Sequence, residues 1–167
     1  MFSKHLRFYS ASLLLSLAAG AAQAAEPLAA INAVPGKPVC HAAPASIDGK
    51  PVAAKVCVIG GSFSSDRYAL ILNGTVIVQG IDDQTTEGVA GSFDGQPVML
   101  RCVPQSLYPK ATPEETQAEV RRILPNASPE KVVETATDVP AMGLELGRIC
   151  TATRGAQALM AVQVLFD

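Results

Sequence analysis

RYALILNGTVIVQGI, residues 67–81, is the stretch of sequence that decides the fold. Two apolar runs rich in β-branched residues flank the dipeptide Asn73-Gly74. Asn-Gly between such runs predicts a β-hairpin with a type I′ turn, because both central residues of that turn need a positive φ. The turn would set Leu70 opposite Ile77. Both faces of the hairpin are then apolar near the turn, so we expect cover on both sides.

Two more hairpins are predicted on either side of this one, by Asp48-Gly49 and by Asp94-Gly95. The turn at Asp94-Gly95 would pair Val89 with Leu100 and place Cys102 on the same apolar face. This part of the chain is therefore expected to be a series of antiparallel strands.

The chain has four cysteines, which is the even number expected of a disulfide framework, and three pairings are possible from sequence alone. A two-residue turn at Asp48-Gly49 sets Cys40 directly opposite Cys57, and cross-strand cysteines at that spacing can bridge. We therefore favour Cys40–Cys57 together with Cys102–Cys150. The second bridge closes the longer loop and contributes on the order of 4 kcal/mol in the chain-entropy model.

The first 24 residues are typical of an export signal. Lys4 and Arg7 precede an apolar run over residues 11–22, and Ala22-Gln23-Ala24 forms a small-x-small cleavage site. The apolar run is shorter than the roughly 20 residues that span a bilayer, and no cysteine follows it as a lipid attachment point. We expect a periplasmic or secreted protein without a transmembrane segment, with a flexible arm over residues 25–37 and one disulfide-braced domain over 38–167.

Charge argues against a nucleic-acid partner. The sequence has 13 basic and 15 acidic residues, and without Lys4 and Arg7 the balance is 11 against 15, or −4. Nucleic acids attract proteins with basic surfaces, so an acidic exported protein is a poor fit to them. A basic protein partner is the charge-compatible alternative, although acidity also serves solubility alone.

The pattern changes to helical after residue 109. Thr112-Pro113 and Ser128-Pro129 both read as an N-cap followed by proline at the first helical position. Two further strands are expected over 144–153 and 156–166. The whole chain is predicted to be α+β and mainly antiparallel, with about eight strands in a barrel-like or strongly twisted sheet and a two-helix insertion near 113–137.

Few side chains suit catalysis. His41 is the one histidine after the export signal, no G-x-S-x-G motif is present, and the thiols are committed to disulfides. Asp82, Asp83 and Glu87 form the densest acidic cluster. They could bind Ca²⁺ or act as the acidic pair of a hydrolase, but their spacing is not that of an EF-hand, and a solvated polar turn is the simpler interpretation. We predict no enzyme activity, no metal and no cofactor.

The candidate binding residues lie in two segments that the central hairpin brings to one rim of the sheet, where its register would place Asp66 opposite Ile81. Arginine and tyrosine are favoured anchors of protein interfaces, and loops on rigid scaffolds often carry recognition. We call these residues the rim: Ser64, Ser65, Asp66, Arg67, Tyr68, Asp82, Asp83 and Glu87.

The sequence thus predicts an exported, non-catalytic module of inhibitor or immunity type that binds an envelope protein through the rim. The alternative is a small-ligand carrier or cell-envelope accessory protein. An interior lined by Leu70, Leu72, Val89 and Leu100 would hold its apolar ligand, although such an interior is more often filled core.

Overall fold

The computed structural model describes residues 28–62 and 64–166. The predicted signal peptide, residues 1–24, lies outside them. Over these residues the chain forms nine strands and three helices, one strand and one helix more than predicted. In chain order they are β1 (Ala30–Asn32), β2 (Pro38–Ile47), β3 (Lys50–Ile59), β4 (Arg67–Leu72), β5 (Thr75–Ile81), α1 (Asp82–Glu87), β6 (Val89–Phe93), β7 (Gln96–Leu107), α2 (Pro113–Ile123), α3 (Pro129–Thr137), β8 (Leu144–Arg154) and β9 (Gln157–Leu165).

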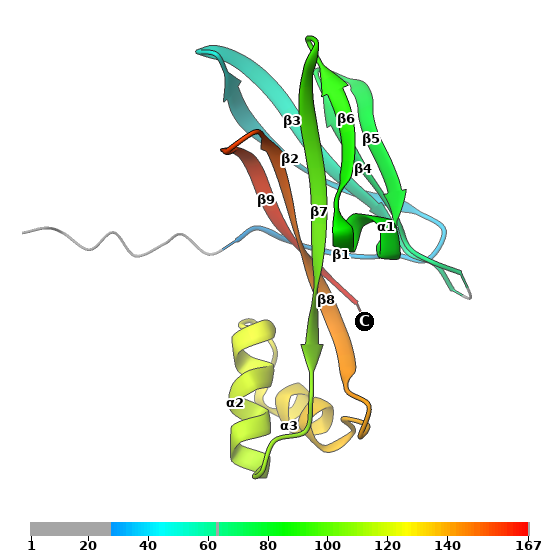
Figure 1. The fold of residues 1–167 in the computed structure, drawn as a ribbon. Helices are drawn as coiled ribbons and strands as arrows, with labels where there is room; N and C mark the ends of the chain where they lie inside the picture. The colour runs from blue at the N-terminus through cyan, green and yellow to red at the C-terminus, as the bar shows by residue number, and fades with distance from the viewer. Residues whose placement is uncertain (1–27, 63, 167) are drawn as a thin grey trace, which may run out of the picture.

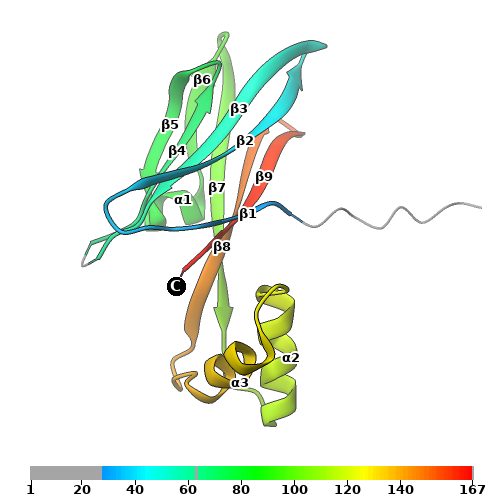
Figure 2. The same cartoon turned by 180° about the vertical axis from the view of Figure 1, so that it is seen from behind.

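The predicted α+β fold is confirmed, and its sheet is divided in two rather than closed into a barrel. One sheet has the order β1-β9-β8-β7-β6 and the other β2-β3-β4-β5. The sheets face each other, while β7 and β8 extend beyond them as a long ribbon toward the α2–α3 hairpin (Figures 1 and 2). The inner faces of both sheets make one continuous core, whose largest fully buried side chains include Tyr68, Leu70, Leu72, Leu100, Val56 and Val58.

All three predicted hairpin turns are present. Asp48, Asn73 and Asp94 have φ of 51°, 49° and 50°, and the glycine after each has a positive φ too. These are the positive φ pairs that a type I′ turn needs. The β6–β7 register is also the predicted one, with Val89 opposite Leu100.

The central hairpin departs from prediction in two ways. A β-bulge between Leu70 and Ile71 shifts the register, so that Leu70 lies opposite Val78 rather than Ile77. The expectation of cover on both faces is also wrong. β5 is the edge strand of its sheet, and Val76, on the outer face, is 53% exposed.

Both disulfides join the predicted partners. Cys40–Cys57 links β2 to β3 and Cys102–Cys150 links β7 to β8, in each case between residues that lie directly opposite in the register. Cys102 and Cys150 are fully buried between the sheets, whereas Cys40 is exposed on an edge strand. Each sheet therefore carries one covalent link between neighbouring strands.

The two predicted helix starts are confirmed. Thr112 Oγ1 accepts from the Glu115 N–H at 3.2 Å, and the Glu115 carboxylate accepts from the Thr112 N–H at 3.2 Å, which completes a capping box. Ser128 caps α3 in the same way through the Lys131 N–H. The helices share a small core of their own with the ribbon, made of Leu107, Val120, Ile123, Val132 and Leu146.

Two segments have more regular structure than the sequence suggests. Residues 82–87, expected as a polar turn, form α1, whose start is capped by the Ile81 N–H donating to Gln84 Oε1 at 3.1 Å. The expected N-terminal arm contributes β1, which pairs in parallel with β9. Among the described residues, none of the helices has the length and apolar character needed to cross a membrane.

Candidate binding site at the rim

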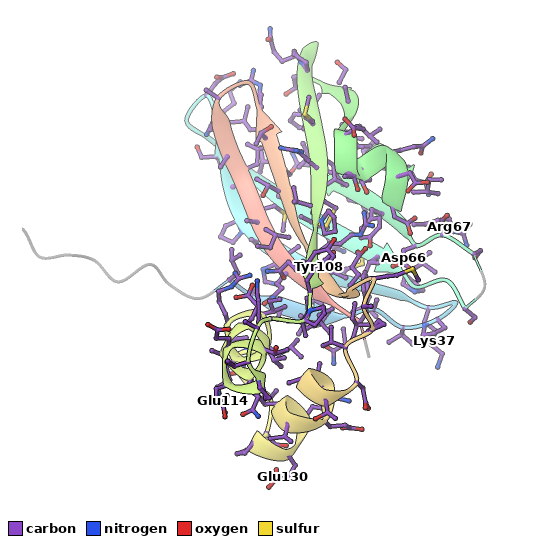
Figure 3. The ribbon with its side chains drawn as sticks, turned by 60° about the horizontal axis from the view of Figure 1, so that its bottom comes forward. Lys37, Asp66, Arg67, Tyr108, Glu114 and Glu130 are labelled. Atoms are coloured by element: carbon purple, nitrogen blue, oxygen red, sulfur yellow. A yellow bond between two sulfur atoms is a disulfide. The ribbon has the colours of Figure 1, made fainter. Side chains whose placement is uncertain are left out.

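The rim is built where β4 begins and β5 ends. Arg67 lies opposite Ile81, so the loop before β4 and the helix after β5 start from adjacent positions. The partner of Ile81 is Arg67 and not Asp66, because the bulge shifts the register by one residue. Figure 3 shows Asp66 and Arg67 at one end of the sheets, away from Glu114 and Glu130 on the helical hairpin.

The loop before β4 is held from inside by Asp66 and Tyr68. Asp66 Oδ1 accepts from the Gly61 N–H at 2.7 Å, and Asp66 Oδ2 accepts from the Tyr68 hydroxyl at 3.3 Å. Tyr68 is completely buried, and burial, together with the negative charge of Asp66, raises the pKa of its hydroxyl far above the ordinary value. Tyr68 therefore supports the loop from the core and offers no surface for contact with a partner.

The helix α1 is held from inside by Arg148, a residue of β8. Its Nη1 donates to the Asp82 carbonyl oxygen and to Thr86 Oγ1, both at 2.9 Å. The guanidinium also makes a forked contact with Glu145, from Nε at 2.6 Å and from Nη2 at 3.3 Å. α1, which connects the two sheets, is thus fastened to the five-stranded one.

Electrostatics explain why a buried arginine is tolerated here. Burial by itself lowers the pKa of the Arg148 guanidinium, but the hydrogen bonds and the negative charge of Glu145 outweigh it, and the net pKa is raised. A buried charge needs such partners, because its transfer out of water is otherwise costly. The Arg148 side chain is 8% exposed and stays cationic.

Sequence reasoning missed Arg148 and Glu145 as parts of this site. The available signal was position: Arg148 is two residues from both Leu146 and Cys150 on β8 and shares their buried face, so its side chain had to point inward. A cation at an inward position implies a buried partner. Nothing local in the sequence identifies that partner as Asp82 and Thr86, more than 60 residues away.

The other predicted residues lie at or near the surface. Ser64, Ser65, Arg67, Asp83 and Glu87 are exposed, and Asp66 and Asp82 are half-buried. Asp82 Oδ1 is buried without a hydrogen-bond partner among the described residues. The outward-facing part of the rim is therefore a set of hydroxyls, one arginine and two carboxylates.

A shallow groove lies beside the loop. Its volume is about 320 Å³, and its lining is Gly36, Ile59, Gly60, Gly61, Ser62, Ser64, Ser65 and Arg67. A second, apolar groove of about 440 Å³ lies on the β2–β3 hairpin, lined by residues 42–45 and 51–54. The first groove adjoins the rim, and its side chains are mostly polar.

The acidic cluster does not form a metal site in the part of the chain that the structure describes. No three His, Cys, Asp or Glu side chains come close enough together there to hold an ion. Asp82, Asp83 and Glu87 instead lie along α1, with both aspartates in its first turn, where acids favour the helix dipole.

Comparison with known proteins places the chain in no family: no family model, no curated protein and no solved structure gives a match. The function is therefore inferred from the geometry of the site.

Proposed function

We propose that this protein is an exported, non-catalytic binding module of inhibitor or immunity type, which docks an envelope protein through the exposed side chains of the rim. Its two disulfides are typical of an extracytoplasmic protein. The partner's contacts would be Ser64, Ser65 and Arg67 on the loop, and Asp83 and Glu87 on α1.

One observation carries this proposal: both rim segments are fastened to the core by polar side chains, of which Tyr68 and Arg148 are buried and Asp66 is half-buried. Asp66 and Tyr68 hold the loop, and Arg148 holds α1. Ordering a flexible loop on binding costs affinity, so segments that are already fixed bind more tightly for the same contacts. A merely solvent-exposed turn has no need of a buried arginine from β8.

The exposed carboxylates favour a partner with basic groups opposite α1. Asp83 and Glu87 are both exposed, and neither is part of an ion pair among the described residues. Charges of opposite sign across an interface speed association and select the correct partner.

Affinity capture from envelope extract tests this proposal with two matched variants. The rim variant carries Asp83→Lys and Glu87→Lys. The control carries Glu114→Lys and Glu130→Lys on the helical hairpin, which reverses two exposed acidic charges and changes the net charge equally. Both variants are first shown to fold by circular dichroism. We expect the wild type and the control to retain one partner that the rim variant loses. Equal recovery by all three, or no recovery by the wild type, would contradict the proposal.

The carrier alternative finds no specific support in the interior. Leu70, Leu72 and Leu100 are completely buried in the shared core, and Val89 packs against it. The side chains that would line a ligand cavity contact one another instead. Native mass spectrometry that found a co-purified small molecule would revive this alternative.

A further inference from the structure

The groove beside the rim is formed by two segments that lie side by side. Pro35 and Gly60 make a parallel bridge, and the Gly36 N–H donates to the Gly60 carbonyl oxygen at 2.9 Å. The loop that closes the groove approaches Gly61 so closely that a Cβ there would lie 1.8 Å from the Ser64 carbonyl oxygen. The floor of the groove is therefore backbone, and its walls are side chains of the loop.

One cation without a carboxylate partner, Arg67, lines this groove, and a second, Lys37, follows Gly36 of the lining. Pro38, Ile59 and Arg67 form one row across β2, β3 and β4, and Lys37 precedes Pro38. Figure 3 shows Lys37 and Arg67 at the same end of the molecule. Within the described residues, neither cation lies within ion-pair distance of an acidic group.

The nearest acid, Asp66, does not neutralise the Arg67 charge at the groove. Both oxygens of Asp66 are already engaged, Oδ1 with the Gly61 N–H and Oδ2 with the buried Tyr68 hydroxyl. The carboxylate is half-buried and bonded toward the loop interior. The Asp66 charge weakens the attraction of the groove for an anion, but the carboxylate does not occupy the face that a ligand would meet.

Hydroxyl donors complete the lining. Ser62, Ser64 and Ser65 are exposed, and their side chains make no hydrogen bond with the rest of the described chain. An arginine fork with nearby hydroxyls matches the acceptor geometry of an oxyanion, since guanidinium groups bind carboxylate and phosphate through two parallel hydrogen bonds.

We propose that this groove binds an oxyanion group, held by Arg67 with the loop serines. The inference deepens the proposed function, on which it rests only for the source of the anion: an acidic side chain or C-terminal carboxylate of the protein partner would dock here, while a basic group of that partner meets α1. A free phosphate or carboxylate is the other source of the same chemistry.

Titration of the ¹⁵N-labelled protein with sodium phosphate and, separately, sodium acetate tests the anion site without any partner. At constant ionic strength, we expect saturable shifts of the Gly60, Gly61 and Arg67 amides. Arg67→Gln should weaken the apparent affinity about tenfold, as expected for a lost charge-assisted hydrogen bond. Lys55→Gln, on the exposed face of β3, is the matched control and should change nothing. Shifts that do not saturate, or that are the same in Arg67→Gln, would overturn the inference.

A second arm separates the two sources. An acetyl-Gly-Ala-Ala peptide with a free C-terminal carboxylate should shift the same amide signals of the protein. The same peptide with an amidated C-terminus should not shift them. If phosphate binds but neither peptide does, the site belongs to a free anion and not to a protein terminus.

Failure of this inference and failure of the proposed function give different results. If the protein does not bind anions but still captures its partner, only the assignment of the groove is contradicted. If phosphate binds saturably but no partner is captured, only the proposed protein-binding function is contradicted.

Discussion

Arg148 shows how much of the site depends on single buried groups. The described residues include two Arg–Glu pairs with the same i, i+3 spacing and the same 2.6 Å closest contact. Arg148–Glu145 is largely buried and also holds α1, whereas the Arg122 side chain is 62% exposed. The two pairs therefore have the same internal spacing and closest contact, and they differ in how deeply they are buried.

Replacement of Arg148 by methionine should lower the free energy of unfolding far more than replacement of Arg122. Arg148→Met leaves the Glu145 carboxylate without its guanidinium partner and removes one of the donors to the Asp82 carbonyl, at a cost of about 2–4 kcal/mol. Arg122→Met removes a surface ion pair worth about 0.5 kcal/mol or less. Urea denaturation measures both. Equal effects would mean that Arg148 does not fasten α1.

Gly61 is the second residue whose identity the site requires. Its φ is ordinary, so the constraint is space, since the loop backbone at Ser64 occupies the position of any Cβ. Gly61→Ala should push the loop outward and break the Gly61 N–H bond to Asp66, at a cost of about 1–3 kcal/mol. We expect faster cleavage in residues 60–66 by limited proteolysis. Ser65→Ala serves as control, and an unchanged cleavage rate in Gly61→Ala would contradict the packing described here.

At the scale of elements, the two disulfides should differ in reactivity. Exchange requires a thiolate to reach a sulfur atom, and only Cys40 is exposed, while Cys102 and Cys150 are fully buried. Dithiothreitol under native conditions, followed by alkylation and peptide mapping, should label Cys40 and Cys57 first. Cys102 and Cys150 should be labelled only after unfolding. Simultaneous labelling of all four would show that access does not control the reaction.

The tips of two hairpins are joined by an ion pair that should make stability depend on pH. Asp48 Oδ1 lies 2.8 Å from Arg154 Nη1, and this hydrogen bond lowers the pKa of Asp48. A folded-state pKa below the unfolded value stabilises the fold above about pH 4, the ordinary value, and the effect is lost as the pH falls through the lowered pKa.

Asp48→Asn, which keeps a residue tolerant of positive φ in the turn, should be less stable than the wild type at pH 7 and nearly equal to it at pH 2. Thermal denaturation at the two pH values measures the difference. In the Arg154→Gln background the substitution should have little effect at either pH. A difference that persists at pH 2 would assign the effect to the turn and not to the ion pair.

Elements defined by local chemistry could be predicted from the sequence, and those defined by distant contacts could not. Turn dipeptides such as Asn73-Gly74 and caps such as Thr112 act within a few residues, and each formed as expected. The helix α1 has no apolar periodicity in Asp-Asp-Gln-Thr-Thr-Glu, and its contacts with Arg148 come from another sheet. The β-bulge at Leu70 likewise left no local signal.

At the scale of the whole molecule, a barrel and a pair of sheets differ in the order of their strands. The alternation of residues within one strand carries no information about that order. Alternation correctly gave the inward face of β7, since both architectures bury one face of each strand, but it wrongly suggested cover on both faces of the central hairpin. The rim could be located because it depends on one hairpin. Its attachment to β8 could not, because it depends on how the two sheets stack.

The architecture separates a braced sandwich from the helical hairpin, which has its own small core at the far end of the β7–β8 ribbon (Figure 1). Gln163 links the two regions by donating to the Ile123 carbonyl oxygen and to Gln105 Oε1, both at 2.7 Å. The rim lies on the sandwich side, so the proposed contact surface and the helical hairpin can be probed separately.

Site-specific photo-crosslinking in living cells is the most direct test of the claim that a rigid rim binds a protein. A photoreactive amino acid is placed singly at Ser65 and Glu87 on the rim, and at Glu114 and Glu134 on the helical hairpin as controls, all of them exposed positions. The account predicts one crosslinked protein common to both rim positions and absent from both controls. Crosslinks from the helical hairpin alone, or none from either rim position in the folded, oxidised protein, would contradict it.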